Sequence, residues 1–153
     1  MSLERYALAI AGPRDFLINL LINTLVPWWV LRGMNTVPLL GNPSVLTLIG
    51  PMGFILVSVT TLSGFLNGVN HRKSGRAGPP PPPRARWLGL ALRTALVNGA
   101  VALAVLVAFI LALAWLLPDI RVSKTVLIGF QAMLAASLGY AVQVKSVLQT
   151  RRW

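Results

Sequence analysis

Four long apolar runs constrain the fold of this chain more than any other feature. A helix that crosses a bilayer needs about 20 consecutive, mostly apolar residues, and soluble core helices rarely supply four such stretches in one short chain. The runs cover residues 16–31, 45–69, 87–117 and 125–144, and the third is interrupted only by Arg93. They predict an all-α membrane protein with four transmembrane helices.

The predicted boundaries extend slightly beyond the apolar runs. We expect a single membrane domain, residues 1–153, with helices over residues 14–33, 45–69, 87–117 and 124–147. Residues 70–86 would form a basic, proline-rich linker. The first run has only 16 residues, so its flanks must contribute to the span. Pro27 and Pro51 lie inside predicted helices, where neighbouring helices can satisfy the carbonyl groups that a proline leaves free.

The cationic residues predict the orientation of these helices. Fourteen Lys and Arg stand against three acidic residues, and the cations gather in the N-terminal segment, the linker and the C-terminal tail. These are Arg5 and Arg14, then Arg72, Lys73, Arg76, Arg84 and Arg86, then Lys145, Arg151 and Arg152. The two opposite loops carry only Arg32, Arg121 and Lys124. Because loops rich in Lys and Arg stay in the cytoplasm, both termini and the linker are predicted to be cytoplasmic.

The two halves of the chain share a weak internal similarity. Asn98 lies 75 residues after Asn23, and Gly129-Phe130 lies 76 residues after Gly53-Phe54. These positions fall on corresponding helices, which favours a tandem duplication of a two-helix hairpin. Both hairpins would enter from the cytoplasm, so the repeats would be parallel rather than inverted.

The linker combines positive charge with five consecutive prolines at positions 79–83. Such a run is typical of a stiff polyproline II spacer, although a proline-recognising partner domain is an alternative. The cationic residues of the linker are expected to contact anionic lipid head groups. They are Arg72, Lys73, Arg76, Arg84 and Arg86. Nucleic-acid binding is not expected, since no aromatic residues are interleaved with the charges.

Polar side chains inside the predicted spans are the candidate site. They are Asn19, Asn23, Asn67, Arg93, Asn98 and Gln143. One interpretation is a polar vestibule, open to the cytoplasm, that binds a small solute, an ion or a lipid head group. The other is a set of interhelical hydrogen bonds that hold the helices together. Small residues at four-residue spacing, notably Gly64 with Gly68 and Ala104 with Ala108, predict close helix packing.

Residue sets for enzymatic chemistry are missing from the sequence. The chain has no cysteine, and its single histidine, His71, falls in the basic linker. With no nucleophile–base pair and no metal-ligand cluster, we expect neither catalysis, nor a metal site, nor a cofactor. The four apolar runs also contain no Asp or Glu, the residues that many proton-coupled pumps carry inside the membrane.

Two stretches, FLINLLINTLVPWWVLRGMNTVPLLGNPSVLTLIG and VLIGFQAMLAASLGYAVQVKSVL, resemble an uncharacterised family of bacterial four-helix membrane proteins. The shared features are an Asn-rich first helix, an Arg-Gly exit, a Val-Pro-Leu turn and a basic, proline-containing middle loop. The resemblance implies a bacterial cytoplasmic-membrane location and the four-helix topology, and it implies no activity.

The expected function is therefore a non-enzymatic accessory or scaffold subunit. It would pack against a larger membrane assembly or against copies of itself, in contact with anionic lipids. The alternative is a small homo-oligomeric channel or transporter for a polar or anionic solute, using Asn19, Asn23, Arg93 and Asn98. A third hypothesis is binding of an anionic lipid or a pigment in grooves between the helices.

Overall fold

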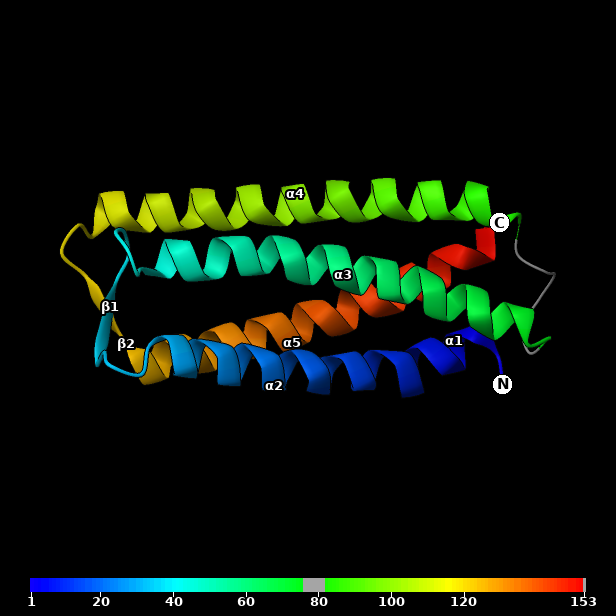
Figure 1. Ribbon diagram of the computed structural model, residues 1–153, viewed down its shortest axis with the longest axis horizontal. Helices are drawn as coiled ribbons and strands as arrows, with labels where there is room; N and C mark the ends of the chain where they lie inside the picture. Colours follow the sequence, from blue (N-terminus) through cyan, green and yellow to red (C-terminus); the bar gives the residue numbers. More distant parts are fainter. Residues whose placement is uncertain (76–81, 153) are drawn as a thin grey trace.

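The computed structural model describes residues 1–75 and 82–152, and these are almost entirely helical (Figure 1). The elements are α1 (Leu3–Tyr6), the π-helical turn η1 (Ala7–Ala11), α2 (Gly12–Val30), β1 (Thr36–Pro38), α3 (Val45–Lys73), α4 (Arg84–Leu116), β2 (Arg121–Ser123), α5 (Lys124–Gln149) and the 3₁₀ turn η2 (Thr150–Arg152). Four helical stretches, Leu3–Val30, Val45–Lys73, Arg86–Leu116 and Lys124–Gln149, are long and apolar enough to cross a membrane. The predicted all-helical chain with four long apolar helices is confirmed.

The first helix begins earlier than the sequence predicts. It starts at Leu3, with the Ser2 side chain accepting a hydrogen bond from the Arg5 amide at 3.3 Å, and it continues without a break into α2. Pro13 does not stop it, because the π-helical turn η1 ends at Ala11, just before this proline. A wider turn accommodates the missing N–H and the bulky ring that would otherwise clash with the preceding turn. The first span is therefore long enough to cross a bilayer.

The described helices also shorten the linker. α3 continues to Lys73, so His71 and Arg72 are helical, and α4 begins at Arg84 immediately after Pro83. At its other end, α3 starts at a capping box. Thr47 N–H donates to Ser44 Oγ at 3.2 Å, and Ser44 N–H donates to Thr47 Oγ1 at 2.9 Å. Residues 76–81, which include most of the predicted polyproline spacer, lie outside the described part of the chain.

The helices stand in a row in the order α2, α5, α3, α4 (Figure 1). α2 packs along α5, α5 packs along α3, and α3 packs along α4, whereas α2 touches α3 at only a few positions. The two helices of each predicted hairpin, α2 with α3 and α4 with α5, are thus not principal packing partners, whereas α3 and α4 on either side of the linker are. Neither predicted hairpin closes on itself, and the two halves of the chain interlock instead.

A short antiparallel ribbon joins the two halves at one end of the row. β1 pairs with β2 in the register Thr36↔Ser123, Val37↔Val122 and Pro38↔Arg121. Both chain termini, the end of α3 and the start of α4 lie at the opposite end (Figure 1). The two loops with few cations therefore meet at one end of the molecule, and the basic segments gather at the other.

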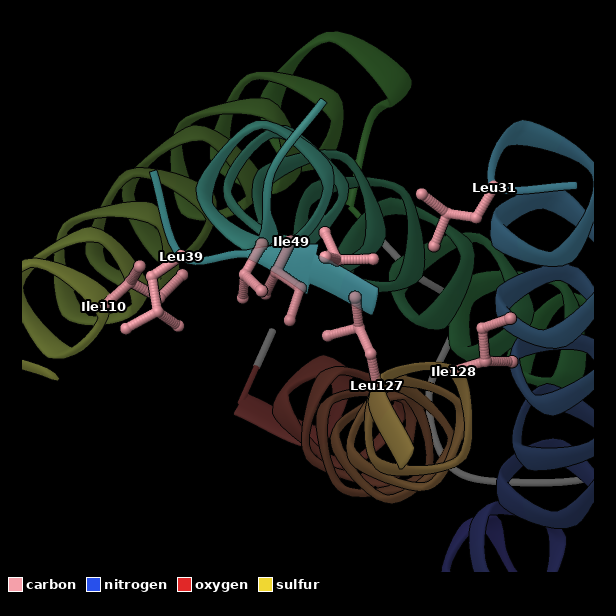
Figure 2. Packing of buried hydrophobic residues seen from close by; sticks show 8 residues of the cluster. Leu31, Leu39, Ile49, Ile110, Leu127 and Ile128 are labelled. Atoms are coloured by element: carbon pink, nitrogen blue, oxygen red, sulfur yellow. The ribbon is translucent and has the colours of Figure 1, made fainter. Parts of the chain in front are cut away.

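An apolar cluster fills the space beneath the ribbon (Figure 2). It combines side chains from the end of α2, from β1, and from α3, α4 and α5. The buried members are Leu31, Val37, Leu39, Val45, Ile49, Ile110, Leu127 and Ile128. An apolar hollow of about 280 Å³ lies beside this cluster, lined by Leu39, Ile49 and Ile110 among others.

Candidate functional site

The buried side of α2 is polar, which is the reverse of a soluble helix. Asp15, Asn19 and Asn23 recur every four residues, a spacing that places them on one side of the helix. Their exposed fractions are 7%, 9% and 3%, whereas Leu21 and Leu25 on the outer side are 59% and 62% exposed. A helix with apolar residues outside and polar residues inside is suited to lipid surroundings.

The α2 amides are anchored to their own helix. Asn19 Nδ2 donates to the Asp15 carbonyl at 2.8 Å, and Asn23 Nδ2 donates to the Asn19 carbonyl at 2.9 Å. Asn19 lies directly against Gly139 of α5, where any side chain would collide with its amide. Asn19 therefore packs into the α2–α5 interface, and the side-chain oxygens of both asparagines are left to accept other hydrogen bonds.

Two glutamines of α5 are buried without full hydrogen bonding. Gln143 is completely buried, and neither its Oε1 nor its Nε2 has a partner among the described residues. Gln131 is 3% exposed, and its Nε2 donates to Met52 Sδ at 2.9 Å, whereas its Oε1 has no partner in the described part of the chain. A buried polar atom that is left unpaired costs about 1–3 kcal/mol, and a small molecule can offset this cost only where there is room for one.

A small cavity lies beside Gln131. Its volume is about 20 Å³, above the ~10–15 Å³ needed to hold a water molecule. The lining comes from all four long helices and includes only two amides, Asn23 and Gln131. The remaining lining residues are Ile49, Met52, Gly53, Leu56, Leu106, Leu134, Ala135 and Leu138. The sequence analysis did not place Gln131 in the candidate site. In the sequence, Gln131 stands out only as an amide within an apolar run, a feature that Gln143 shares.

The six predicted polar residues do not form one cluster. Asn19 and Asn23 lie between α2 and α5, and Gln143 lies between α5 and α3, near Gly64. Asn98 is on the far side of α3, where its Nδ2 approaches Thr61 Oγ1 at 3.4 Å. Asn67 and Arg93 lie apart from these residues and from each other. Asn67 Nδ2 donates to Ser63 Oγ within α3 at 3.3 Å, and Arg93 is exposed on α4.

The predicted packing residues differ in their surroundings. Gly64 and Gly68 lie at the contact with α5, where an added Cβ would approach the Gln143 and Val147 carbonyl oxygens to 3.1 Å each. Ala104 and Ala108 are instead exposed, on the side of α4 that faces away from α3. They contribute nothing to packing within the described chain.

The residues predicted to contact lipid head groups differ in their exposure. Lys73, Arg84 and Arg86 are exposed, and Arg76 is outside the described residues. Arg72, in contrast, is 3% exposed and donates from Nη1 to the Thr150 carbonyl at the end of α5. A cation is favoured there because the last carbonyl groups of a helix carry partial negative charge. The structure thus gives Arg72 a partner within the protein, where head-group contact was expected.

The N-terminal segment completes this basic end of the row. The His71 ring stacks on Tyr6 with 4.4 Å between the ring centroids, and its Nε2 lies 3.1 Å from the Met1 carbonyl oxygen. Arg151 pairs with Glu4 at 3.2 Å. The sequence placed His71 in a loop, but it is helical, buried and in contact with the N-terminal segment.

The first apolar run contains no acidic residue, but the helix that carries it does. Asp15 falls inside the candidate span Leu3–Val30 and is 7% exposed. Its Oδ1 lies 3.6 Å from Nη2 of Arg14, whose side chain is half exposed. Asp15 was already part of the predicted helix over residues 14–33, but its burial beside Asn19 was not predicted.

Comparison with known proteins gives no relative from which a function could be transferred. The chain matches no protein-family model, no curated protein and no solved structure above the level expected by chance. The resemblance to a bacterial four-helix family stays a prediction, and the candidate function must be argued from the helices and side chains themselves.

Proposed function

We propose that this protein is a non-enzymatic, multi-pass accessory or scaffold subunit of the bacterial cytoplasmic membrane. It packs against a larger membrane assembly or against a second copy of itself. One observation carries the proposal: α4 stands at the edge of the row and exposes small residues on its outward side.

The outward side of α4 is suited to close approach by another helix. Ala95, Gly99 and Ile110 are buried toward α3, and a four-spaced series of alanines is exposed on the opposite side. The series is Ala100, Ala104, Ala108 and Ala112. Small residues at this spacing let two helix backbones pack closely, which drives association where lipid removes the hydrophobic effect between helices.

The other edge of the row offers a useful contrast. α2 also has a free outward side, but this side carries large residues such as Leu17, Leu21 and Trp28. Bulky side chains of this kind contact lipid tails and keep a neighbouring helix at a distance. α4 exposes large side chains as well, such as Val105 and Phe109, so it is the four-spaced alanine series that distinguishes this edge and favours α4 as the docking helix.

The charge distribution supports a cytoplasmic location for both termini. The basic ends of α3 and α5 and the N-terminal segment lie at one end of the row, and the β1–β2 ribbon lies at the other (Figure 1). By the positive-inside rule, the basic end faces the cytoplasm. The exposed Lys73, Arg84 and Arg86 would then contact anionic head groups of the inner leaflet.

The helix order supports a tandem duplication. If the α2–α3 half is exchanged with the α4–α5 half, the α2–α5 contact becomes the α4–α3 contact, and the central α3–α5 contact maps onto itself. The β1–β2 pair also maps onto itself. A parallel repeat with an axis along the membrane normal has this pattern.

The test is the mass of the gently extracted protein, measured by native mass spectrometry. The wild-type protein is expected to appear as an oligomer or bound to a partner. The Ala104→Trp and Ala108→Trp variants are each expected to appear as a monomer. Ala141→Trp is the matched control, because Ala141 is an exposed alanine on α5, away from the proposed surface. A wild-type protein that runs as a monomer and retains no partner contradicts the proposal.

A second candidate function is a small homo-oligomeric channel or transporter for a polar or anionic solute. The buried Asn19 and Asn23 on α2 favour it, since intramembrane polar residues commonly mark solute paths. Solute flux into proteoliposomes that falls on changing Asn19, Asn23, Asn98 or Arg93 would support this function. Flux that is unaffected by all four changes would exclude these residues as a path.

A further inference from the structure

We infer that the cavity between Asn23 and Gln131 binds one water-sized hydrogen-bond donor. This site is separate from the proposed docking surface on α4, and its presence does not depend on the oligomeric state. The cavity is formed by α2, α3, α4 and α5 together, so it exists only when all four helices are in place.

The chemistry of the occupant follows from how the Gln131 amide is held. Its Nε2 donates to Met52 Sδ at 2.9 Å. A thioether sulfur can accept but not donate, so the amide nitrogen must be the atom that faces it. The atom without a partner among the described residues is therefore Oε1, an acceptor in a side chain that is 97% buried. The missing partner must be a donor.

Asn23 supplies a second acceptor by the same reasoning. Its Nδ2 is occupied by the Asn19 carbonyl oxygen at 2.9 Å, a geometry that fixes the orientation of this amide as well. Its Oδ1 is the polar atom that Asn23 can offer to the cavity that it lines. The two amides that line the cavity thus each carry a carbonyl-type oxygen as their remaining acceptor, one on α2 and one on α5, which suits a small molecule with at least two donor hydrogens.

The size and charge of the cavity favour water. A volume of about 20 Å³ admits one water-sized molecule. An ammonium ion has similar size and more donors, but no acidic residue lines the cavity among the described residues. A full positive charge in such surroundings would lack a counter-ion, and isolated buried charge is strongly disfavoured.

Apolar side chains make up most of the wall around this occupant, although the hollow is not fully enclosed. Ile49 lines the cavity and also belongs to the cluster beneath the ribbon, where Figure 2 shows it among Leu39, Ile110 and Leu127. The cluster separates the cavity from the ribbon end of the row. On the other side, Asn19 and Asp15 continue the polar stripe of α2 toward the basic end. The bound molecule would bridge α2 and α5 at a depth where lipid cannot supply a hydrogen bond.

The test is water-edited solid-state NMR on the full chain in lipid bilayers, with ¹³C at the glutamine side-chain carbonyl. Glutamine occurs only at positions 131, 143 and 149, so three resonances are expected. Magnetisation from water should reach Gln131, which is 3% exposed, several-fold faster than Gln143, which is fully buried and does not line the cavity. Transfer to Gln131 that is as slow as transfer to Gln143 overturns the inference, unless the ammonium titration below identifies an occupant.

Two variants and one titration identify the occupant. Asn23→Leu should slow transfer to Gln131 several-fold, and Asn19→Leu, one turn away and outside the cavity lining, should not. If Asn23→Leu does not fold, the wild-type comparison decides alone. Ammonium chloride is then titrated against tetramethylammonium chloride. A saturable shift of the Gln131 carbonyl with ammonium alone identifies ammonium as the donor. Fast transfer without a shift identifies water, and the absence of both overturns the site.

Discussion

The side-chain amide of Asn19 on α2 lies directly on Gly139 of α5, where an added Cβ would overlap its Nδ2. This contact joins the first and last membrane helices, which are at opposite ends of the sequence. It lets α2 and α5 approach closely enough for their polar side chains to be enclosed between them, and it explains why a glycine is needed at this position.

Gly139→Ala should therefore destabilise the helix row. The added methyl group must displace Asn19 from a close-packed interface, and overpacking of this kind typically costs about 1–3 kcal/mol. Thermal unfolding in mild detergent, followed by circular dichroism, measures the change. Gly129→Ala is the control on the same helix, because a Cβ there meets open space. It should be neutral or slightly stabilising, and equal losses for both variants would contradict the Asn19–Gly139 contact.

The span positions could be predicted from the sequence, but the partners of the helices could not. Apolar run length reports directly on bilayer thickness, so three of the four spans were placed to within a few residues. Small residues such as Gly64 and Ala104 indicate that another helix packs closely there. They do not indicate whether that helix belongs to the same chain or to another protein. Only the folded chain shows that Gly64 contacts α5 and that Ala104 is left free.

The candidate site was only partly predictable for a related reason. Asn19 and Asn23 were identified because amides are rare in apolar runs. Asp15 and Gln131 were missed as site residues, because their roles depend on neighbours. Asp15 is buried by its neighbours in the folded chain, and Met52 accepts a hydrogen bond from the amide of Gln131. Neither relationship is encoded in local composition.

Arg72→Gln should destabilise the basic end of the protein, whereas Lys73→Gln should not. Arg72 is buried and donates to the Thr150 carbonyl, and hydrogen bonds to charged groups contribute about 1.5–3 kcal/mol. Lys73 is the exposed neighbour on the same turn and serves as the matched control. Unfolding midpoints in detergent give the stability, and binding to anionic nanodiscs gives the lipid contact. A larger lipid-binding defect for Arg72→Gln than for Lys73→Gln, with unchanged stability, would restore the head-group role.

The ribbon predicts an efficient disulfide between the two loops. Thr36 and Ser123 are partners in the antiparallel register, and directly opposed residues have Cβ atoms about 4.5–5.5 Å apart. Thr36→Cys with Ser123→Cys should therefore cross-link within one chain under mild oxidation, with no competing native thiol. The product is detected as a reduction-sensitive shift in gel mobility. Thr36→Cys with Asp119→Cys is the control, since Asp119 precedes the strand and is unpaired in this register. Equal cross-linking of both pairs would show that the loops lack the described pairing.

Membrane sidedness can be measured with single cysteines, because the natural sequence contains none. Ser74 is exposed at the basic end, and Asp119 is exposed in the loop before β2 at the opposite end. If the positive-inside rule sets the orientation, Asp119→Cys in intact spheroplasts reacts with a membrane-impermeant maleimide. Ser74→Cys reacts only after the cells are opened. The reverse pattern would place both termini outside. Equal labelling of both positions in intact cells would indicate two orientations and would remove the basis for assigning the basic end to the cytoplasm.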